Sequence, residues 1–298
     1  MYADKFKIAL LGNLYQEKKW SLVGELLDVF RRLDAEVVIP QAFYDFITHR
    51  LGLSLEGCTL VPDTAELIAD VAVCMGGDGT FLDVASRVGH KQIPLLGINT
   101  GHLGFLANYV PGEVEDALRE VMNGHSHIEE RTVITLSATG TTLQGCTSAL
   151  NEIAILKHDI SAMINIHTFV NHEYLTTYRA DGLIIATPTG STAYSLSVGG
   201  PIIEPHLSAL TLTPVAPHSL NMRPLVVTDT STIDLEVESR SGSFLVSLDG
   251  RSQSYKTGIS LHIQKAPYTL KLLTHPDHTF FSTLRQKMMW GLDGRENL

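Results

Sequence analysis

Two different hydrophobic periods divide the sequence. In roughly the first third, short apolar runs alternate with segments whose apolar residues recur at the three- to four-residue spacing of a helix. The predicted strands are 6–11, 35–39, 71–75 and 93–98, and the predicted helices are 22–33, 81–88 and 114–122. This alternation predicts a largely parallel sheet with helices on its faces, a Rossmann-like α/β domain.

From about residue 129 the pattern changes to period two, which is typical of half-buried strands. The alternating apolar positions are Val133 and Leu136; Ile233, Leu235 and Val237; Leu261 and Ile263; and Tyr268, Leu270 and Leu272. The expected fold is therefore an α/β N-terminal domain plus a β-rich C-terminal domain, α+β overall. We expect the first domain at 1–125 and the second at 126–275, with the tail 276–298 packing back on the first.

Composition limits the partners. A chain of 298 residues with 44% hydrophobic content can bury more than one core, which agrees with two domains. A net charge of −10 and a pI near 5.7 exclude a broad nucleic-acid-binding face, which would have to be basic. Any anionic ligand must therefore be held by a local arrangement.

The cysteines and histidines predict no metal centre. Cys58, Cys74 and Cys146 are odd in number and widely spaced, so we interpret them as reduced packing residues. The thirteen histidines form no HxxxH or HExxH pair, which disfavours a zinc site. No apolar run approaches a membrane span and no targeting segment is evident, so a cytoplasmic protein without membrane contact is expected.

A glycine cluster follows the apolar strand at 71–75. Residues 76–80 read Gly-Gly-Asp-Gly-Thr and open the next predicted helix. Gly76, Gly77 and Gly79 permit positive φ angles and let backbone N–H groups approach a ligand, and a helix start adds a positive dipole end. Thr80 with Asp83 fits a capping box, which predicts that the helix starts there. Phosphate is the ligand that this arrangement favours.

Asp78 is the unexpected member of the cluster, because its carboxylate would by itself repel a phosphate. Base chemistry or metal binding would give it a reason, and capping of a tight turn is the structural alternative. A role in phosphoryl transfer fits the flanking glycines better.

Several later motifs carry a resemblance to a known family. The GGDGT segment resembles the signature of NAD kinases, shared with diacylglycerol-kinase-type lipid kinases and related to that of phosphofructokinases. Residues 99–106 (NTGHLGFL), 151–152 (NE) and 181–195 (DGLIIATPTGSTAYS) are similar to NAD kinases specifically. The likeness extends through 217–226 and 281–290, so it covers the chain from about residue 70 to residue 291.

The resemblance implies an NAD kinase, which phosphorylates the 2′-hydroxyl of the adenosine ribose of NAD with ATP or polyphosphate and a divalent cation, Mg²⁺. It implies that Asp78 is catalytic. The ligand-binding residues it implies, together with those inferred from the motifs, are Gly76, Gly77, Gly79, Thr80, Phe105, Asn151, Glu152, Arg179, Asp181, Thr192, Ala193, Tyr194, Ser195, Ser197 and Arg251. No metal ligand is expected in the chain, so the cation would bind mainly through phosphates and water.

The roles of several of these residues stay open at this point. Phe105 either forms a wall of the nucleotide site or only packs, and Asn151 with Glu152 either grips a ribose or purine edge or forms a solvated strand end. Tyr194 could offer its ring to a base. Arg179 and Asp181 lie two apart, so on a strand both would face the ligand, with Arg179 as an anion anchor.

One position departs from the family pattern. Residues 249–251 read Asp-Gly-Arg where relatives usually read Asp-Gly-Gln, so a cation replaces a neutral amide at Arg251. If the loop is near the site, this adds positive potential. Two other functions remain as alternatives, a lipid kinase and a nucleotide-binding regulator without turnover. A homo-oligomer, dimer or tetramer, is expected from the apolar second domain and the family likeness; the donor and the choice between NAD⁺ and NADH stay open.

Overall fold

The computed structural model describes residues 5–12, 21–101, 104–159 and 162–289. The chain divides into two compact units, Met1–Glu130 with Leu270–Leu298 and Arg131–Thr269. His102, Leu103 and Trp290, which belong to the motifs described above, lie outside the described residues. The domain boundaries expected at 125/126 and 275/276 stay predictions.

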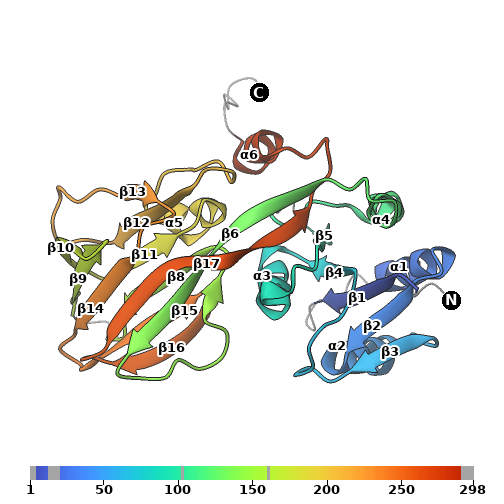
Figure 1. The fold of residues 1–298 in the computed structure, drawn as a ribbon, viewed down its shortest axis with the longest axis horizontal. Coiled ribbons are helices and arrows are strands. Elements are labelled where there is room, and N and C mark those ends of the chain that lie inside the picture. Colours follow the sequence, from blue (N-terminus) through green and yellow to red (C-terminus); the bar gives the residue numbers. More distant parts are fainter. Residues whose placement is uncertain (1–4, 13–20, 102–103, 160–161, 290–298) are drawn as a thin grey trace, which may run out of the picture. The chain divides into compact units, whose positions relative to one another are not determined.

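Unit 1 contains a parallel sheet with strand order β5-β4-β1-β2-β3 (Figure 1). Its strands are β1 (Lys7–Gly12), β2 (Glu36–Pro40), β3 (Cys58–Val61), β4 (Val71–Gly76) and β5 (Leu95–Asn99). Its helices are α1 (Ser21–Arg32), α2 (Gln41–Asp45), η1 (Phe46–Arg50), α3 (Asp78–Val88), η2 (Gly89–Lys91), η3 (Pro111–Glu113), α4 (Val114–Met122) and α6 (Phe280–Met288). The predicted parallel α/β arrangement is confirmed, although β3, α2 and η1 were not predicted.

The two faces of this sheet carry side chains of different size. Large residues at alternate positions of the strands, such as Ile8, Val73 and Ile98, form the main core with α1 and α4. The intervening positions are smaller, and at Gly97 an added Cβ would lie 2.8 Å from the ring of Phe81 on α3. Helix α3 therefore packs close to the sheet, and the strand–loop–helix turn that carries Asp78 has a fixed position.

Unit 2 is built from two antiparallel sheets that enclose a common core (Figure 1). One sheet contains β10-β9-β14-β17, with β6 paired to β17 and β7 to β6, and the other has the order β13-β12-β11-β8-β15-β16. The strands are β6 (Ile128–Thr139), β7 (Ser148–Ala149), β8 (Glu152–Lys157), β9 (Ile164–Val170), β10 (Glu173–Ala180), β11 (Gly182–Ala186), β12 (Ala209–Val215), β13 (Leu225–Thr228), β14 (Ile233–Glu238), β15 (Ser243–Leu248), β16 (Arg251–Lys256) and β17 (Ser260–Leu273). Period-two residues such as Ile233, Leu235 and Leu261 lie in this core, so the predicted β-rich domain is confirmed. A 3₁₀ turn η4 (Thr189–Thr192) and the single-turn helix α5 (Tyr194–Ser197) follow β11.

Two local predictions are wrong. Helix α3 begins at Asp78 with Gly77 as its N-cap, so Thr80 and Asp83 do not form the predicted cap. Gly77 has an ordinary φ of −92° and Gly79 lies within the helix, so neither glycine adopts a positive φ angle. The physical reason is that the chain turns at Gly76, where an added Cβ would contact the Thr80 side chain, so the helix begins at Asp78, two residues before the expected start.

The cysteines are all free, but only two are packing residues. Cys74 is buried in β4, where burial raises the pKa of its thiol, and half-buried Cys58 packs against the main core of unit 1. Cys146 is exposed in the segment before β7, so the interpretation of all three as packing residues is wrong there. None of the described helices has the length and apolar character needed to cross a membrane.

Candidate functional site

The carboxylate of Asp78 is held by backbone N–H groups from another segment of unit 1. Its Oδ2 accepts a hydrogen bond from Phe105 N at 3.0 Å, and its Oδ1 accepts from Leu106 N at 3.0 Å and Ala107 N at 3.2 Å. Gly104 precedes these donors, and a Cβ there would overlap the Asp78 carboxylate. The GGDGT turn and the 104–107 segment therefore form one cluster.

A lysine completes this cluster. Lys287 on α6 places its Nζ 3.3 Å from Asp78 Oδ2 and 4.8 Å from the centre of the Phe105 ring. The Phe105 ring also packs against Phe280 at the start of α6, with ring centres 6.1 Å apart. Sequence reasoning missed Lys287, and it left open whether Phe105 packs; here Phe105 packs against α6.

The glycines beside Asp78 face open space. A Cβ built on Gly77 or Gly79 would meet no described atom within 4 Å. Thr80 lies in the first turn of α3, against Gly76. Because no contact with the described residues requires glycine at 77 and 79, their lack of side chains leaves room for a ligand to approach the helix start.

A second aspartate organises the corresponding part of unit 2. Asp249 Oδ2 accepts a hydrogen bond from Leu150 N at 2.7 Å, and its Oδ1 accepts from Asn151 N at 2.8 Å and Glu152 N at 3.0 Å. Asp249 itself has φ +47°, a left-handed conformation rare outside glycine. These bonds fix the bend between β7 and β8, which lets neighbouring residues at 151 and 152 serve one ligand.

Several polar atoms beside this bend are buried without a hydrogen-bond partner among the described residues: Asn151 Oδ1, Glu152 Oε2 and Thr189 Oγ1. The η4 turn packs directly on the bend, because Thr187 N donates to Asn151 O and Thr187 Oγ1 donates to Leu150 O. An unpaired buried polar atom costs about 1–3 kcal/mol, and folded proteins retain few of them outside functional sites. A ligand rich in hydroxyl groups would satisfy all three, and Thr189 joins the two residues expected from the sequence.

The predicted residues of the 192–197 segment differ in their surroundings. The backbone N–H of Tyr194 acts on the Glu152 carboxylate in the direction of a lower pKa, and the Tyr194 ring is exposed. Thr192 and Ala193 are half-buried, and Ser197 is exposed. Ser195 is fully buried with its hydroxyl 2.9 Å from that of Thr213, so its side chain has a structural partner.

Arg179 and Asp181 do not share a strand face, so that prediction is wrong. Strand β10 ends at Ala180 and β11 begins at Gly182 in the other sheet, so Asp181 occupies the bend between the sheets. Arg179 is exposed, whereas Asp181 forms an ion pair with Lys157 at 2.7 Å. The two-residue rule fails because it holds only while the strand continues.

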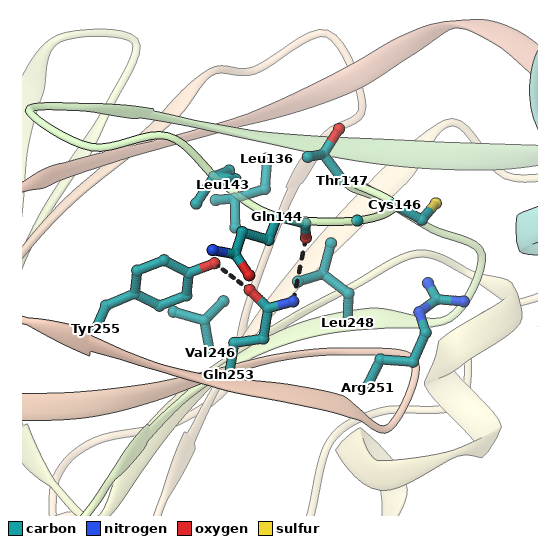
Figure 2. A pocket seen from close by; sticks show the side chains of 11 residues that line it. Leu136, Leu143, Gln144, Cys146, Thr147, Val246, Leu248, Arg251, Gln253 and Tyr255 are labelled. Atoms are coloured by element: carbon teal, nitrogen blue, oxygen red, sulfur yellow. Dashed lines mark hydrogen bonds between the residues drawn. The ribbon is translucent and has the colours of Figure 1, made fainter.

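Arg251 has neighbours that account for its presence. Its Nη2 donates to Ser148 O at 3.0 Å and lies 4.0 Å from Asp249 Oδ2. Figure 2 shows it at the rim of a cavity of about 110 Å³, beyond the hydrogen-bonded pair Gln253 and Tyr255. The loop is therefore close to the Asn151–Glu152 bend, and the guanidinium adds its charge beside Asp249.

Three potential metal ligands meet elsewhere in unit 1. One ligand atom each of Glu113, His275 and His278 lie within 4.8 Å of one another. Two already have backbone partners, since Val110 N donates to Glu113 Oε2 and His278 Nδ1 donates to Asn108 O. These contacts fasten the connection between β17 and α6 to residues 108–113, and imidazole ligands do not suit Mg²⁺.

Burial raises the pKa of the Glu152 carboxyl group. Burial first, and then the negative charge of Asp249, raise the pKa of Glu152 to about 7, while the Tyr194 N–H acts in the opposite direction. Between pH 4.5 and 7 the folded protein therefore binds a proton that the unfolded chain has lost, and stability falls as pH rises through this window.

We expect Glu152→Gln to remove this penalty. Relative to the wild type, the free energy of unfolding of the variant should rise by about 2–3 kcal/mol between pH 5 and pH 8, measured by chemical unfolding. Glu173→Gln replaces an exposed glutamate of the same unit. Over the same pH range, its unfolding free energy relative to the wild type should change by less than about 0.5 kcal/mol. If the difference in unfolding free energy between Glu152→Gln and the wild type did not change with pH, the burial argument would be contradicted.

Known proteins resemble the whole chain. A family model described as the ATP-NAD kinase N-terminal domain matches residues 58–126, and one described as the ATP-NAD kinase C-terminal domain matches residues 150–275. The NAD kinase of Bacteroides fragilis is 52% identical over 97% of this chain and 99% of its own length. The NAD kinase of Porphyromonas gingivalis is 42% identical over 96% of this chain and 98% of its own length.

Solved structures agree in fold. Yeast NADH kinase complexed with NADH superposes with a TM-score of 0.87 at 22% identity, covering 97% of this chain and 89% of that one. An NAD kinase from Archaeoglobus fulgidus in complex with ATP has a TM-score of 0.73 at 26% identity, covering 94% of this chain and 99% of that one. With two matching family models and full-length relatives at this identity, the chain belongs to the NAD kinase family.

Proposed function

We propose that this protein transfers the γ-phosphoryl group of ATP to the 2′-hydroxyl of the adenosine ribose of NAD, giving NADP⁺ and ADP. The observation that carries the proposal is that two polar clusters, around Asp78 and around Glu152, are present in a chain 52% identical to an NAD kinase. An assay that couples NADP⁺ formation to an NADP⁺-specific dehydrogenase tests it. No NADP⁺ from NAD⁺, Mg²⁺ and ATP would contradict it, and phosphorylation of diacylglycerol instead would favour the lipid-kinase alternative.

In the proposed reaction, the O–H bond of the 2′-hydroxyl breaks and its proton goes to the Asp78 carboxylate. The ribose oxygen forms a bond to the γ-phosphorus, the bond to the β,γ-bridging oxygen breaks, and ADP leaves with that electron pair. Backbone N–H groups at the start of α3 would bind the phosphates. A carboxylate is a weak base, so it would accept the proton late, in a loose transition state.

Mg²⁺ would enter with the nucleotide. Both oxygens of Asp78 are already occupied, and the described residues around it supply no octahedral set of oxygen ligands. Mg²⁺ commonly binds through phosphates and water with few protein ligands. We therefore treat the metal as part of the donor substrate.

The Glu152 cluster would bind the NAD ribose and base. Asn151 Oδ1, Glu152 Oε2 and Thr189 Oγ1 are acceptors that ribose hydroxyls or an adenine amino group could satisfy. Asp181 with Lys157 and the exposed Tyr194 ring lie in the same unit as candidate contacts. An anion-anchoring role for Arg179 stays a prediction.

We expect Asp78→Asn to lower kcat at least ~10²-fold, the scale of a lost general base. An asparagine also cannot accept every hydrogen bond that Asp78 accepts, so a loss of about 1–3 kcal/mol in unfolding free energy should accompany it. ATP binding measured by calorimetry separates the two effects and should change less than kcat. Turnover at the wild-type level would leave Asp78 as a structural clamp alone.

Gly79→Ala should raise the KM for ATP about 10-fold or more without destabilising the fold. The added methyl meets no described atom, and alanine is favoured in a helix by up to about 1 kcal/mol, so a defect would come from the ligand. Gly24→Ala, in α1 with equally open surroundings, is the matched control and should leave ATP kinetics unchanged. Normal ATP kinetics in both variants would place the phosphates elsewhere.

We also propose a homo-oligomer. Val226 lies in the edge strand β13 with 47% of its surface exposed, and Leu220 nearby in sequence is 88% exposed. An exposed edge with apolar side chains favours association. Light scattering at assay concentration should give a molar mass of two or more chains of 32.6 kDa each. A fully active monomer would contradict the proposal.

A further inference from the structure

Lys287 lies in the family-like segment 281–290, to which the sequence analysis gave no role, yet it reaches the centre of the Asp78 cluster. Its Nζ donates to Asp78 Oδ2 at 3.3 Å and lies over the Phe105 ring. The side chain keeps 37% of its surface exposed. It is therefore both partnered and accessible to a dissolved ligand.

The rest of α6 holds Lys287 in this position. Thr279 caps the helix by accepting a hydrogen bond from Ser282 N, and Phe280 packs against Phe105. Before the helix, His278 donates to Asn108 O. Because these contacts fix the helix backbone, the flexible lysine side chain can move without moving α6.

The contacts of Asp78 leave it no capacity to accept a proton. A carboxylate has about four lone-pair positions, and the three N–H donors and Lys287 use four. The three backbone donors belong to a packed segment, whereas the Lys287 bond is made by a long, partly exposed side chain. Lys287 is thus the partner that can leave Oδ2 at least cost.

A phosphate chain bound at the start of α3 would be a second anionic partner for Lys287. The protein is acidic, and a phosphate at the start of α3 would face the Asp78 carboxylate. Two other cations of unit 1, Arg87 and Lys91, already pair with Asp63 and Glu66. Lys287 is close enough to respond to a phosphate, and its ammonium group binds phosphate as a point charge.

We propose that Lys287 is a ligand of the donor's triphosphate, and that its transfer from Asp78 to the phosphates frees the Oδ2 lone pair that accepts the ribose proton. This inference rests on the proposed function, because it assigns the phosphate donor to the GGDGT turn. It makes Lys287 a binding residue that also couples donor binding to the availability of the base.

The test compares Lys287→Met and Lys287→Arg with Arg285→Met, a cation of the same helix turn without a contact to Asp78 in the described structure. Inorganic tripolyphosphate is the probe, since it lacks the nucleoside. Its Kd, from calorimetry, should rise about 10- to 100-fold in Lys287→Met, the scale of a lost charged hydrogen bond. Lys287→Arg should stay within about 5-fold, and Arg285→Met should match the wild type.

Steady-state kinetics separates this role from a structural one. In Lys287→Met the KM for ATP should rise while the KM for NAD and the melting temperature change little. Unchanged tripolyphosphate binding, or ATP and NAD constants that rise together as the protein loses stability, would overturn the proposal and leave Lys287 as a link between α6 and the turn. A wild type that binds tripolyphosphate but forms no NADP⁺ would instead refute the proposed function.

Discussion

Three successive backbone N–H groups directed at one carboxylate are the interaction on which the candidate site depends, and the protein uses it twice. Asp78 accepts from residues 105–107 and Asp249 from residues 150–152. In a regular strand, successive N–H groups point in opposite directions, so each carboxylate stabilises an irregular bend. The bends in turn require a glycine at 104 and a left-handed Asp249. Each motif is therefore half of a contact whose other half lies elsewhere in its unit.

This interaction resolves the electrostatic problem that Asp78 poses. A carboxylate beside phosphate-binding amides is unfavourable unless its charge is balanced, and the amides of 105–107 with Lys287 balance it without using the N–H groups at the start of α3. Those N–H groups stay available for an anion. The phosphate site and its carboxylate can thus coexist in an acidic protein.

The sequence predicts the features that local patterns determine. Apolar periodicity located some strands of each unit, such as β4 and β14, which coincide with predicted runs, and the helix at 114–122 matches α4. It failed where chain geometry depends on distant contacts. The start of α3 is set by the turn at Gly76 rather than by Thr80, and the two-residue rule for Arg179 and Asp181 failed because the chain changes sheets at residue 181. Lys287 lies 209 residues from Asp78, and no spacing rule links a C-terminal helix to a glycine turn.

The two clusters treat their polar atoms in opposite ways, and this difference bears on what each can bind. Around Glu152, buried acceptors have no partner among the described residues, so that bend carries a desolvation cost that a hydroxyl-bearing ligand would relieve. Around Asp78 every lone pair has a donor, so the free protein carries no such cost there, and a ligand must compete for an existing partner. A neutral donor competes less well than an ammonium group for a carboxylate, whereas a phosphate chain attracts the ammonium group itself. The first cluster therefore selects for hydrogen-bond donors on a sugar or base, and the second favours an anion that can draw Lys287 away from Asp78.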